Sequence, residues 1–255
     1  MTRHRPPLAL RPVAGTEAPA IETAMILAAG LGKRMRPLTA TRPKPLVEVA
    51  GKPLLDHLID RLRSAGIGRV VVNVHYLADA LEAHLHQNSA GLEVLVSDER
   101  GELLETGGGV IKALPLIPDD RFLIVNSDNL WIDGPIDAIR LLAARWDDDT
   151  MDALLLTVPL ARAHCHGGPG DFHMDANGRL TRRKQGRVAP FVFTGVQLVS
   201  RRFFENAPEG HFSMNLLWNR AIAAGRLYGV VHQGLWFDVG TPGAIARTEA
   251  LLAEA

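Results

Sequence analysis

The stretch from Ala24 to Pro45, AMILAAGLGKRMRPLTATRPKP, constrains this 255-residue chain more than any other part of it. It opens with a short apolar run, Met25–Ala29, which is too short for a helix and ends at a glycine, so it predicts a buried β-strand. Gly30 and Gly32 follow, and there the backbone can turn sharply and leave its N–H groups uncovered. The stretch therefore predicts a strand that ends in a loop with exposed amide donors.

Cations follow this loop and extend the prediction from shape to chemistry. Lys33, Arg34 and Arg36 come directly after the glycines, and Lys44 lies between two prolines. Exposed amides beside several cations suit a polyphosphate, because each phosphate oxygen needs a donor and the charge needs neutralising. The loop is not a Walker loop, since no GKS or GKT follows it. It is not the dinucleotide motif GxGxxG either, since Met35 occupies the position of the third glycine.

From Leu27 to Pro53 the chain resembles, nearly position for position, the signature LxxGxGxRxxPLTxxxPKPLxxxxGKP of the sugar-1-phosphate nucleotidyltransferases. The resemblance implies that Arg34 stabilises the departing pyrophosphate and that Lys44 bridges the α-phosphate and the sugar phosphate. The residues that it implies for binding the nucleoside triphosphate in this loop are Ala28, Ala29, Gly30, Gly32, Lys33, Arg34 and Lys44.

The composition excludes several classes of partner. Lys and Arg together number 28, as do Asp and Glu, so no basic excess indicates a nucleic acid. No apolar run approaches the roughly 20 residues that cross a bilayer, so we expect no membrane partner. Cys165 is the single cysteine, which excludes an intrachain disulfide and fits a reducing cytoplasm. We expect residues 1–22, rich in Pro, Ala and Arg, to be a mobile tail, and residues 23–255 to form a single nucleotidyltransferase domain.

Short apolar runs alternate with helical periodicity along this domain. The alternation predicts an α/β fold, Rossmann-like and doubly wound, with a mixed, mostly parallel sheet. In such sheets ligands bind beyond the carboxyl ends of the strands, where Gly30, Asn73 and Asp128 fall. Residues 161–190 break the pattern, and the turn signal Asn177–Gly178 predicts a small antiparallel excursion on the sugar-phosphate side.

Asp128 and Asp238 each follow an apolar strand, and we expect them to act together. A nucleoside triphosphate is normally handled as its magnesium complex, and Mg²⁺ takes oxygen ligands from one or two carboxylates besides phosphates and water. The resembling family carries its metal ligands in NGD-like and WxDxGTP-like segments, which implies Mg²⁺ held by these two aspartates. Either aspartate taken alone could instead be a helix cap or a turn former. Ser127 stands where a glycine commonly precedes the first of them, which predicts altered local geometry with the ligand retained.

A second glycine-rich segment, ETGGG at residues 105–109, predicts a loop that leads into a helix. Glycines there would let a planar base lie against the backbone. The resemblance implies that Glu105, Thr106, Gly107 and Gly108 contact the nucleotide, with Gly108 at the base, and that Asn73 lies near the base. The alternative is a flexible loop before a helix that Thr106 caps.

The sugar phosphate is the other expected substrate. The resemblance implies that it is bound by Asn126, Asp171, Thr194 and Gly195. The GPGDF segment followed by FTG resembles a small branch of the family, the uridylyltransferases that act on N-acetylmuramic acid 1-phosphate in cell-wall recycling. The run HCH at 164–166 could be a metal site, but we interpret it as loop residues because no further ligands accompany it.

The predicted reaction is nucleotidyl transfer: an oxygen of the sugar phosphate attacks the α-phosphorus of UTP, and pyrophosphate leaves. Because the nucleophile is already an anion, alignment and charge neutralisation by Arg34, Lys44, Asp128 and Asp238 suffice without a Ser/His/Asp relay. The shared signature leaves open GTP with mannose 1-phosphate, or dTTP or UTP with glucose 1-phosphate. A nucleotide-sugar sensor on the same fold is the non-enzyme alternative. We expect a monomer or small homo-oligomer in the cytoplasm.

Overall fold

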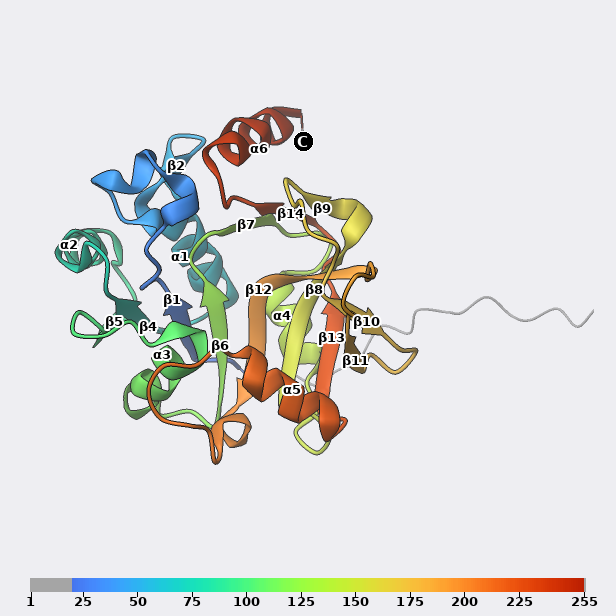
Figure 1. The fold of residues 1–255 in the computed structure, drawn as a ribbon. Helices are drawn as coiled ribbons and strands as arrows, with labels where there is room; N and C mark the ends of the chain where they lie inside the picture. The colour runs from blue at the N-terminus through green and yellow to red at the C-terminus, as the bar shows by residue number, and fades with distance from the viewer. Residues whose placement is uncertain (1–19, 255) are drawn as a thin grey trace, which may run out of the picture.

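The structure is a computed structural model that describes residues 20–254. The tail predicted for residues 1–22 lies almost entirely outside this part of the chain. A mixed nine-stranded sheet forms the centre, with the strand order β11-β10-β12-β6-β1-β4-β5, and β8 and β13 attached beside β12 (Figure 1). The strands β6, β1, β4 and β5 are parallel neighbours, as the alternating pattern predicts. The Rossmann-like α/β class is therefore confirmed.

The first strand of this sheet, predicted at Met25–Ala29, is observed at Thr23–Leu27. The strands of the sheet are β1 (Thr23–Leu27), β4 (Arg69–Val74), β5 (Glu93–Asp98), β6 (Arg121–Asn126), β8 (Ala153–Pro159), β10 (Phe172–Met174), β11 (Leu180–Arg182), β12 (Phe191–Ser200) and β13 (Leu227–Val231). The antiparallel part reaches beyond residues 161–190, because β12 pairs antiparallel with both β6 and β8.

Helices cover both faces of the sheet, and the alternation of side chains along each strand explains why. Ile26 of β1 packs in one apolar core with α1, α2 and α4, whereas its neighbour Met25 packs in a second core with α3 and α5 (Figure 1). Successive side chains of a strand point to opposite faces, so a strand covered on both sides is apolar throughout. The helices are α1 (Leu54–Ala65), α2 (Ala78–Asn88), α3 (Glu105–Ala113), α4 (Ala138–Arg145), α5 (Asn215–Ala223) and α6 (Pro242–Glu254).

A second, three-stranded sheet lies across the carboxyl ends of the parallel strands, with α6 above it (Figure 1). Its strand order is β7 (Asn129–Ile132), β14 (Leu235–Asp238) and β9 (Ala163–His164), and we call it the small sheet. It packs in a third apolar core with Met35, which joins it to the phosphate loop. The sequence predicts β14 but neither β7 nor β9, because each is too short to show a period of its own. A two-stranded ribbon of β2 (Glu48–Val49) and β3 (Lys52–Pro53) completes the strands among the described residues.

Candidate active site

The glycine-containing loop after β1 is held in place at both ends. The backbone N–H groups of Ala28 and Ala29 donate to Asn73 Oδ1, at 2.7 and 3.3 Å. Gly32 has a φ of 61°, in the left-handed region that favours glycine, and its carbonyl accepts from Thr39 Oγ1 at 2.8 Å. Below the turn, fully buried Met35 anchors the loop in the third core. Hydrogen bonds and packing thus fix the conformation of this loop at the carboxyl end of β1.

Asn73 fixes this loop through its side-chain amide, a role that the sequence did not reveal. Its Nδ2 donates to Oε1 of Glu99 at 2.7 Å, and Glu99 Oε2 accepts from the backbone N–H of Leu104 at 3.0 Å. Glu99 is fully buried, and a Cβ placed on Gly109 would lie 2.7 Å from its Oε1. The Asn73–Glu99 pair therefore links the ends of β1, β4 and β5 to the start of α3. The predicted contact of Asn73 with the base stays a prediction.

The prediction that residues 105–109 form a loop is wrong, because these residues are the first turns of α3. Gly107 and Gly108 donate their backbone N–H groups to the carbonyl of Phe212, at 2.9 and 3.2 Å. A Cβ on Gly108 would lie 2.0 Å from the carbonyl oxygen of Gly210, so the glycines allow this segment to cross the helix. Thr106 does not cap the helix: its Oγ1 accepts from the backbone N–H of Met214 at 2.9 Å. The two buried glycines belong to this packing, whereas the side chains before them face the cavity.

Two cations and two carboxylates meet at the sheet edge. Lys44 Nζ forms an ion pair with Asp128 Oδ2, and their side chains are 13% and 25% exposed. Asp128 directly precedes Asn129, the first residue of β7, whose cross-strand partner in β14 is Asp238. A Cβ on Gly240 would lie 3.0 Å from Asp238 Oδ1 and 3.3 Å from a terminal nitrogen of Arg34. The predicted convergence of chain-distant charges is thus present in the fold.

A cavity of about 450 Å³ opens beside these charges, between the phosphate loop, α3 and the end of β6. Twelve predicted site residues line it: Ala28, Ala29, Gly30, Gly32, Lys33, Arg34, Lys44, Asn73, Glu105, Thr106, Asn126 and Asp128. Its walls are partly backbone amides and partly cationic side chains. The volume and lining suit a nucleotide, since small-molecule sites are clefts of roughly 300–1,000 Å³.

The other predicted site residues lie outside the lining of this cavity. Thr194 is fully buried and its Oγ1 donates to the carbonyl of Leu156 at 2.9 Å, so its hydroxyl serves the fold. Gly195 has a φ of 83°, and a Cβ on it would lie 1.8 Å from Asn129 Nδ2. Asp171 Oδ2 accepts from the backbone N–H of Phe193 at 2.9 Å. The sugar-phosphate contacts predicted for these residues stay predictions.

His166, which the sequence predicts to be a loop residue, also lies at this site. Its Nδ1 donates to Asp238 Oδ2 at 3.0 Å. The hydrogen bond and the charge of Asp238 raise the pKa of His166 above its ordinary value, with burial acting in the opposite sense. Its neighbour His164 instead packs against Phe237, with the rings tilted and their centroids 5.3 Å apart. Residues 20–254 contain no group of three or more His, Cys, Asp or Glu placed to hold a metal.

Comparisons with known proteins agree with this geometry. The family model described as nucleotidyl transferase matches residues 23–168. The chain is 45% identical over 243 residues to the N-acetylmuramate alpha-1-phosphate uridylyltransferase of Caulobacter vibrioides, covering 94% of this chain and all of the relative. It is 34% identical over 230 residues to the protein of the same name from Neisseria meningitidis serogroup B, covering 89% of this chain and 97% of the relative.

The solved structure of UDP-glucose pyrophosphorylase with UDP-glucose shares the fold, with a TM-score of 0.76 at 14% identity, covering 92% of this chain and all of that one. The chain belongs to the nucleotidyl transferase family. It is an enzyme of the sugar-1-phosphate nucleotidyltransferase class, as its signature predicts. Among residues 20–254, every helix is too short or too polar to span a bilayer.

Proposed function

We propose that this protein transfers the uridylyl group of UTP to N-acetylmuramic acid 1-phosphate. The choice of substrates is supported by the two uridylyltransferases that match nearly their whole length to this chain. The observation that carries the chemistry is the Lys44–Asp128 ion pair at the edge of the cavity, with Asp238 on the next strand of the small sheet. A sensor would not need this charge arrangement, whereas an enzyme that catalyses nucleotidyl transfer does.

The reaction balances without a further reactant. An oxygen of the sugar phosphate forms a bond to the α-phosphorus of UTP, and the bond from the α-phosphorus to the bridging oxygen breaks. The electron pair leaves with pyrophosphate, and UDP-N-acetylmuramic acid is the other product. Arg34 stands where it would neutralise the leaving pyrophosphate, and Lys44 where it would draw the two reacting phosphates together.

The carboxylates fit Mg²⁺, the cofactor that the family resemblance implies. Asp128 uses one oxygen for Lys44 and Asp238 uses one for His166, and neither second oxygen has a hydrogen-bond partner among the described residues. Asp128 lines the cavity, and Asp238 Oδ1 lies with the Arg34 guanidinium on the side of Gly240. Carboxylate oxygens are the donor type that this hard cation prefers. When bound there, Mg²⁺ would hold the phosphates and absorb the charge that develops on them.

The nucleotide is expected to occupy the 450 Å³ cavity. Its phosphates would lie on the backbone amides of residues 28–33, and its base near Glu105, Thr106 and the α3 glycines, including Gly107 and Gly108. The sugar phosphate would approach from the side of Asn126, which lines the same cavity, toward Asp171, Thr194 and Gly195.

A grid of substrates tests the proposal. Each of UTP, GTP, CTP, ATP and dTTP is combined with N-acetylmuramic acid 1-phosphate, mannose 1-phosphate and glucose 1-phosphate, with and without Mg²⁺. Pyrophosphate release is followed and the product mass is determined. We expect the highest kcat/KM for UTP with N-acetylmuramic acid 1-phosphate, and only with Mg²⁺. A better pair elsewhere in the grid would replace the proposed substrates, and no release with any pair would favour the sensor.

A further inference from the structure

His166 is brought to Asp238 by the topology of the small sheet rather than by nearness in the sequence. The strand β9 runs parallel to β14, and His164 is the register partner of Phe237. Two residues beyond His164, the imidazole of His166 reaches Asp238 Oδ2 with its Nδ1 at 3.0 Å. Among residues 20–254 this is the one hydrogen bond that the carboxylate of Asp238 makes.

The backbone around His166 is shaped to hold the ring there. Cys165 has a φ of 61°, a left-handed conformation that costs a non-glycine residue energy. Its Sγ lies 3.8 Å from the carbonyl of Ala244 and 3.7 Å from Thr248 Oγ1, so the turn is attached to α6. On the far side of the ring, a Cβ on Gly168 would lie 2.5 Å from His166 Nε2. The turn at Cys165 thus brings the imidazole to this place, the glycine leaves room for it, and the side chain of His166 is only 17% exposed.

The two oxygens of Asp238 have different surroundings. Oδ2 accepts the hydrogen bond from His166, whereas Oδ1 lies on the side of Gly240 and the Arg34 guanidinium. A carboxylate is free to rotate about its last bond unless a partner holds one oxygen. The imidazole supplies that partner from outside the phosphate site, and it leaves Oδ1 toward the site.

We propose that His166 is a positioning residue for Asp238. Its Nδ1–H holds Oδ2 and thereby sets the rotation of the carboxylate, so that Oδ1 is presented beside Arg34 where a divalent cation and the phosphates would meet. The inference rests on the proposed function, because it gives Asp238 the role of a metal ligand. Partners that orient a ligating carboxylate commonly change metal affinity or activity about 10- to 100-fold when they are removed.

Variants at one position separate this role from simple packing. In His166→Asn the amide N–H can stand where Nδ1–H stands. In His166→Gln the donor reaches further, toward the place of Nε2, and His166→Ala removes it. His164→Ala is the matched control, because that ring packs against Phe237 and makes no hydrogen bond to the carboxylate. Circular dichroism and thermal melting establish that each variant is folded.

The primary measurement is Mn²⁺ binding by electron paramagnetic resonance, with a non-hydrolysable UTP analogue present, so that no turnover is needed. We expect the Kd for Mn²⁺ to rise about tenfold or more in His166→Ala and His166→Gln. It should stay within about threefold of the wild type in His166→Asn and His164→Ala. In turnover, the Mg²⁺ concentration for half-maximal rate should rise in the first two variants, with the KM for the sugar phosphate unchanged.

Two outcomes overturn the inference and can be told apart. If the folded His166→Ala and His166→Gln variants bind Mn²⁺ as tightly as the wild type, or if His166→Asn is as impaired as they are, Nδ1 does not position Asp238 while the proposed function stands. If the wild type neither binds Mn²⁺ with the nucleotide analogue nor releases pyrophosphate, the proposed function fails and the inference fails with it.

Discussion

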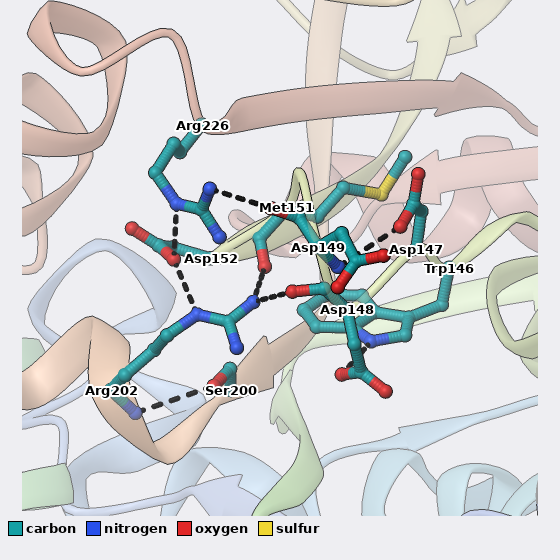
Figure 2. Close-up of polar contacts among 9 residues, drawn as sticks. All are labelled: Trp146, Asp147, Asp148, Asp149, Met151, Asp152, Ser200, Arg202 and Arg226. Atoms are coloured by element: carbon teal, nitrogen blue, oxygen red, sulfur yellow. Dashed lines mark hydrogen bonds and ion pairs between the residues drawn. The ribbon is translucent and has the colours of Figure 1, made fainter.

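The two ends of the sheet both hold aspartates beside cations, but they use them differently. At the amino end of β8, Asp152 Oδ1 accepts from the Nε of Arg202 at 2.8 Å and from the Nε of Arg226 at 2.7 Å. The same arginines also donate to backbone carbonyls of the turn at residues 148–151, so Figure 2 shows a cluster closed on itself. At the carboxyl end, Asp128 and Asp238 have one partner each.

The difference teaches how to separate structural from functional carboxylates. Around Asp152 two arginines share one carboxylate oxygen and bond to the backbone of the adjoining turn, and the pairs join the end of β12 to the starts of β8 and β13. At the carboxyl end each aspartate has a single partner, and Asp128 lines a cavity of backbone amides and cations. We call the Asp152 cluster the closed end, because its arginines are bonded to the surrounding backbone, and the Asp128 and Asp238 region the incomplete end, because it borders an open cavity that can take a ligand.

The largest effect should come from Lys44→Ala at the incomplete end. Removal of one well-placed electrostatic donor costs about 10²- to 10³-fold in rate, because no other group replaces its charge in the transition state. We expect kcat/KM for pyrophosphate release to fall by that factor, with the melting temperature almost unchanged. The control is Lys52→Ala, which removes a lysine paired with Asp60 on the surface and absent from the cavity lining. Near-wild-type turnover in Lys44→Ala would remove Lys44 from the mechanism.

At the closed end we expect a substitution to lower the stability and leave the activity unchanged. Asp152→Ala leaves two guanidinium groups without their carboxylate, and both are partly exposed, so water compensates in part. We expect the free energy of unfolding to fall by about 1–3 kcal/mol, measured by urea denaturation. The kcat of the folded fraction should not change. Asp60→Ala, in a more exposed pair, should cost less than about 1 kcal/mol. If Asp152→Ala abolished turnover of folded protein, the contrast between the two ends would be wrong.

A smaller effect should follow from Gly240→Ala, which tests how tightly the incomplete end is built. The new methyl group would stand 3.0 Å from Asp238 Oδ1 and 3.3 Å from Arg34, so one of them must move. A misplacement of about 1 Å can cost about 10²-fold in rate. The shift needed here is smaller, so we expect kcat to fall about tenfold or less. Gly243→Ala is the control, because its Cβ would meet nothing within 4 Å. Equal kcat in both variants would show that catalysis does not depend on the spacing of Asp238 and Arg34 around Gly240.

The sequence predicted the sheet well, because its strands follow from local pattern. Apolar runs marked the parallel strands, and the rule that ligands bind at their carboxyl ends brought Gly30 and Asp128 to one edge. His166 was missed because its contact depends on β9, a two-residue strand paired with β14 some seventy positions later in the chain. No period of two or 3.6 is visible in so short a strand.

The glycine-rich segment at 105–109 shows the opposite error, in which a local rule was overridden by packing. Several glycines in succession are unfavourable in a helix, which is why the segment was predicted as a loop. In the structure, the carbonyl of Phe212 accepts from Gly107 and Gly108, and Gly210 approaches too closely for any side chain at 108. Contacts more than a hundred residues away in sequence thus decide the helix. Glu99 was missed for a similar reason, because only the fold shows that it is buried beside Asn73.

The smallest effect that we expect is a dependence of stability on pH at the incomplete end. His232 directly follows β13, and its backbone N–H donates to the carbonyl of Thr157 in β8 at 2.7 Å. Its Nε2 lies 3.1 Å from the carbonyl of Ile132 and 3.2 Å from that of Leu235, so Nε2–H donates to both. Burial lowers the pKa of His232 below its ordinary value. The Asp152–Arg202–Arg226 cluster has no histidine and should lack this dependence.

The direction of this pH dependence follows from the lowered pKa of His232. The unfolded chain takes up a proton at His232 at a higher pH than the folded one, so the free energy of unfolding falls as the pH drops below about 6.5. The raised pKa of His166 acts in the opposite direction, since its contribution is lost as the pH rises through the folded value. Urea denaturation of the wild type and of His232→Gln between pH 5 and 8 isolates the contribution of His232, because both proteins contain His166. The wild type should lose more stability on acidification than the variant, and parallel curves would show that the pKa of His232 is the same in the folded and unfolded states.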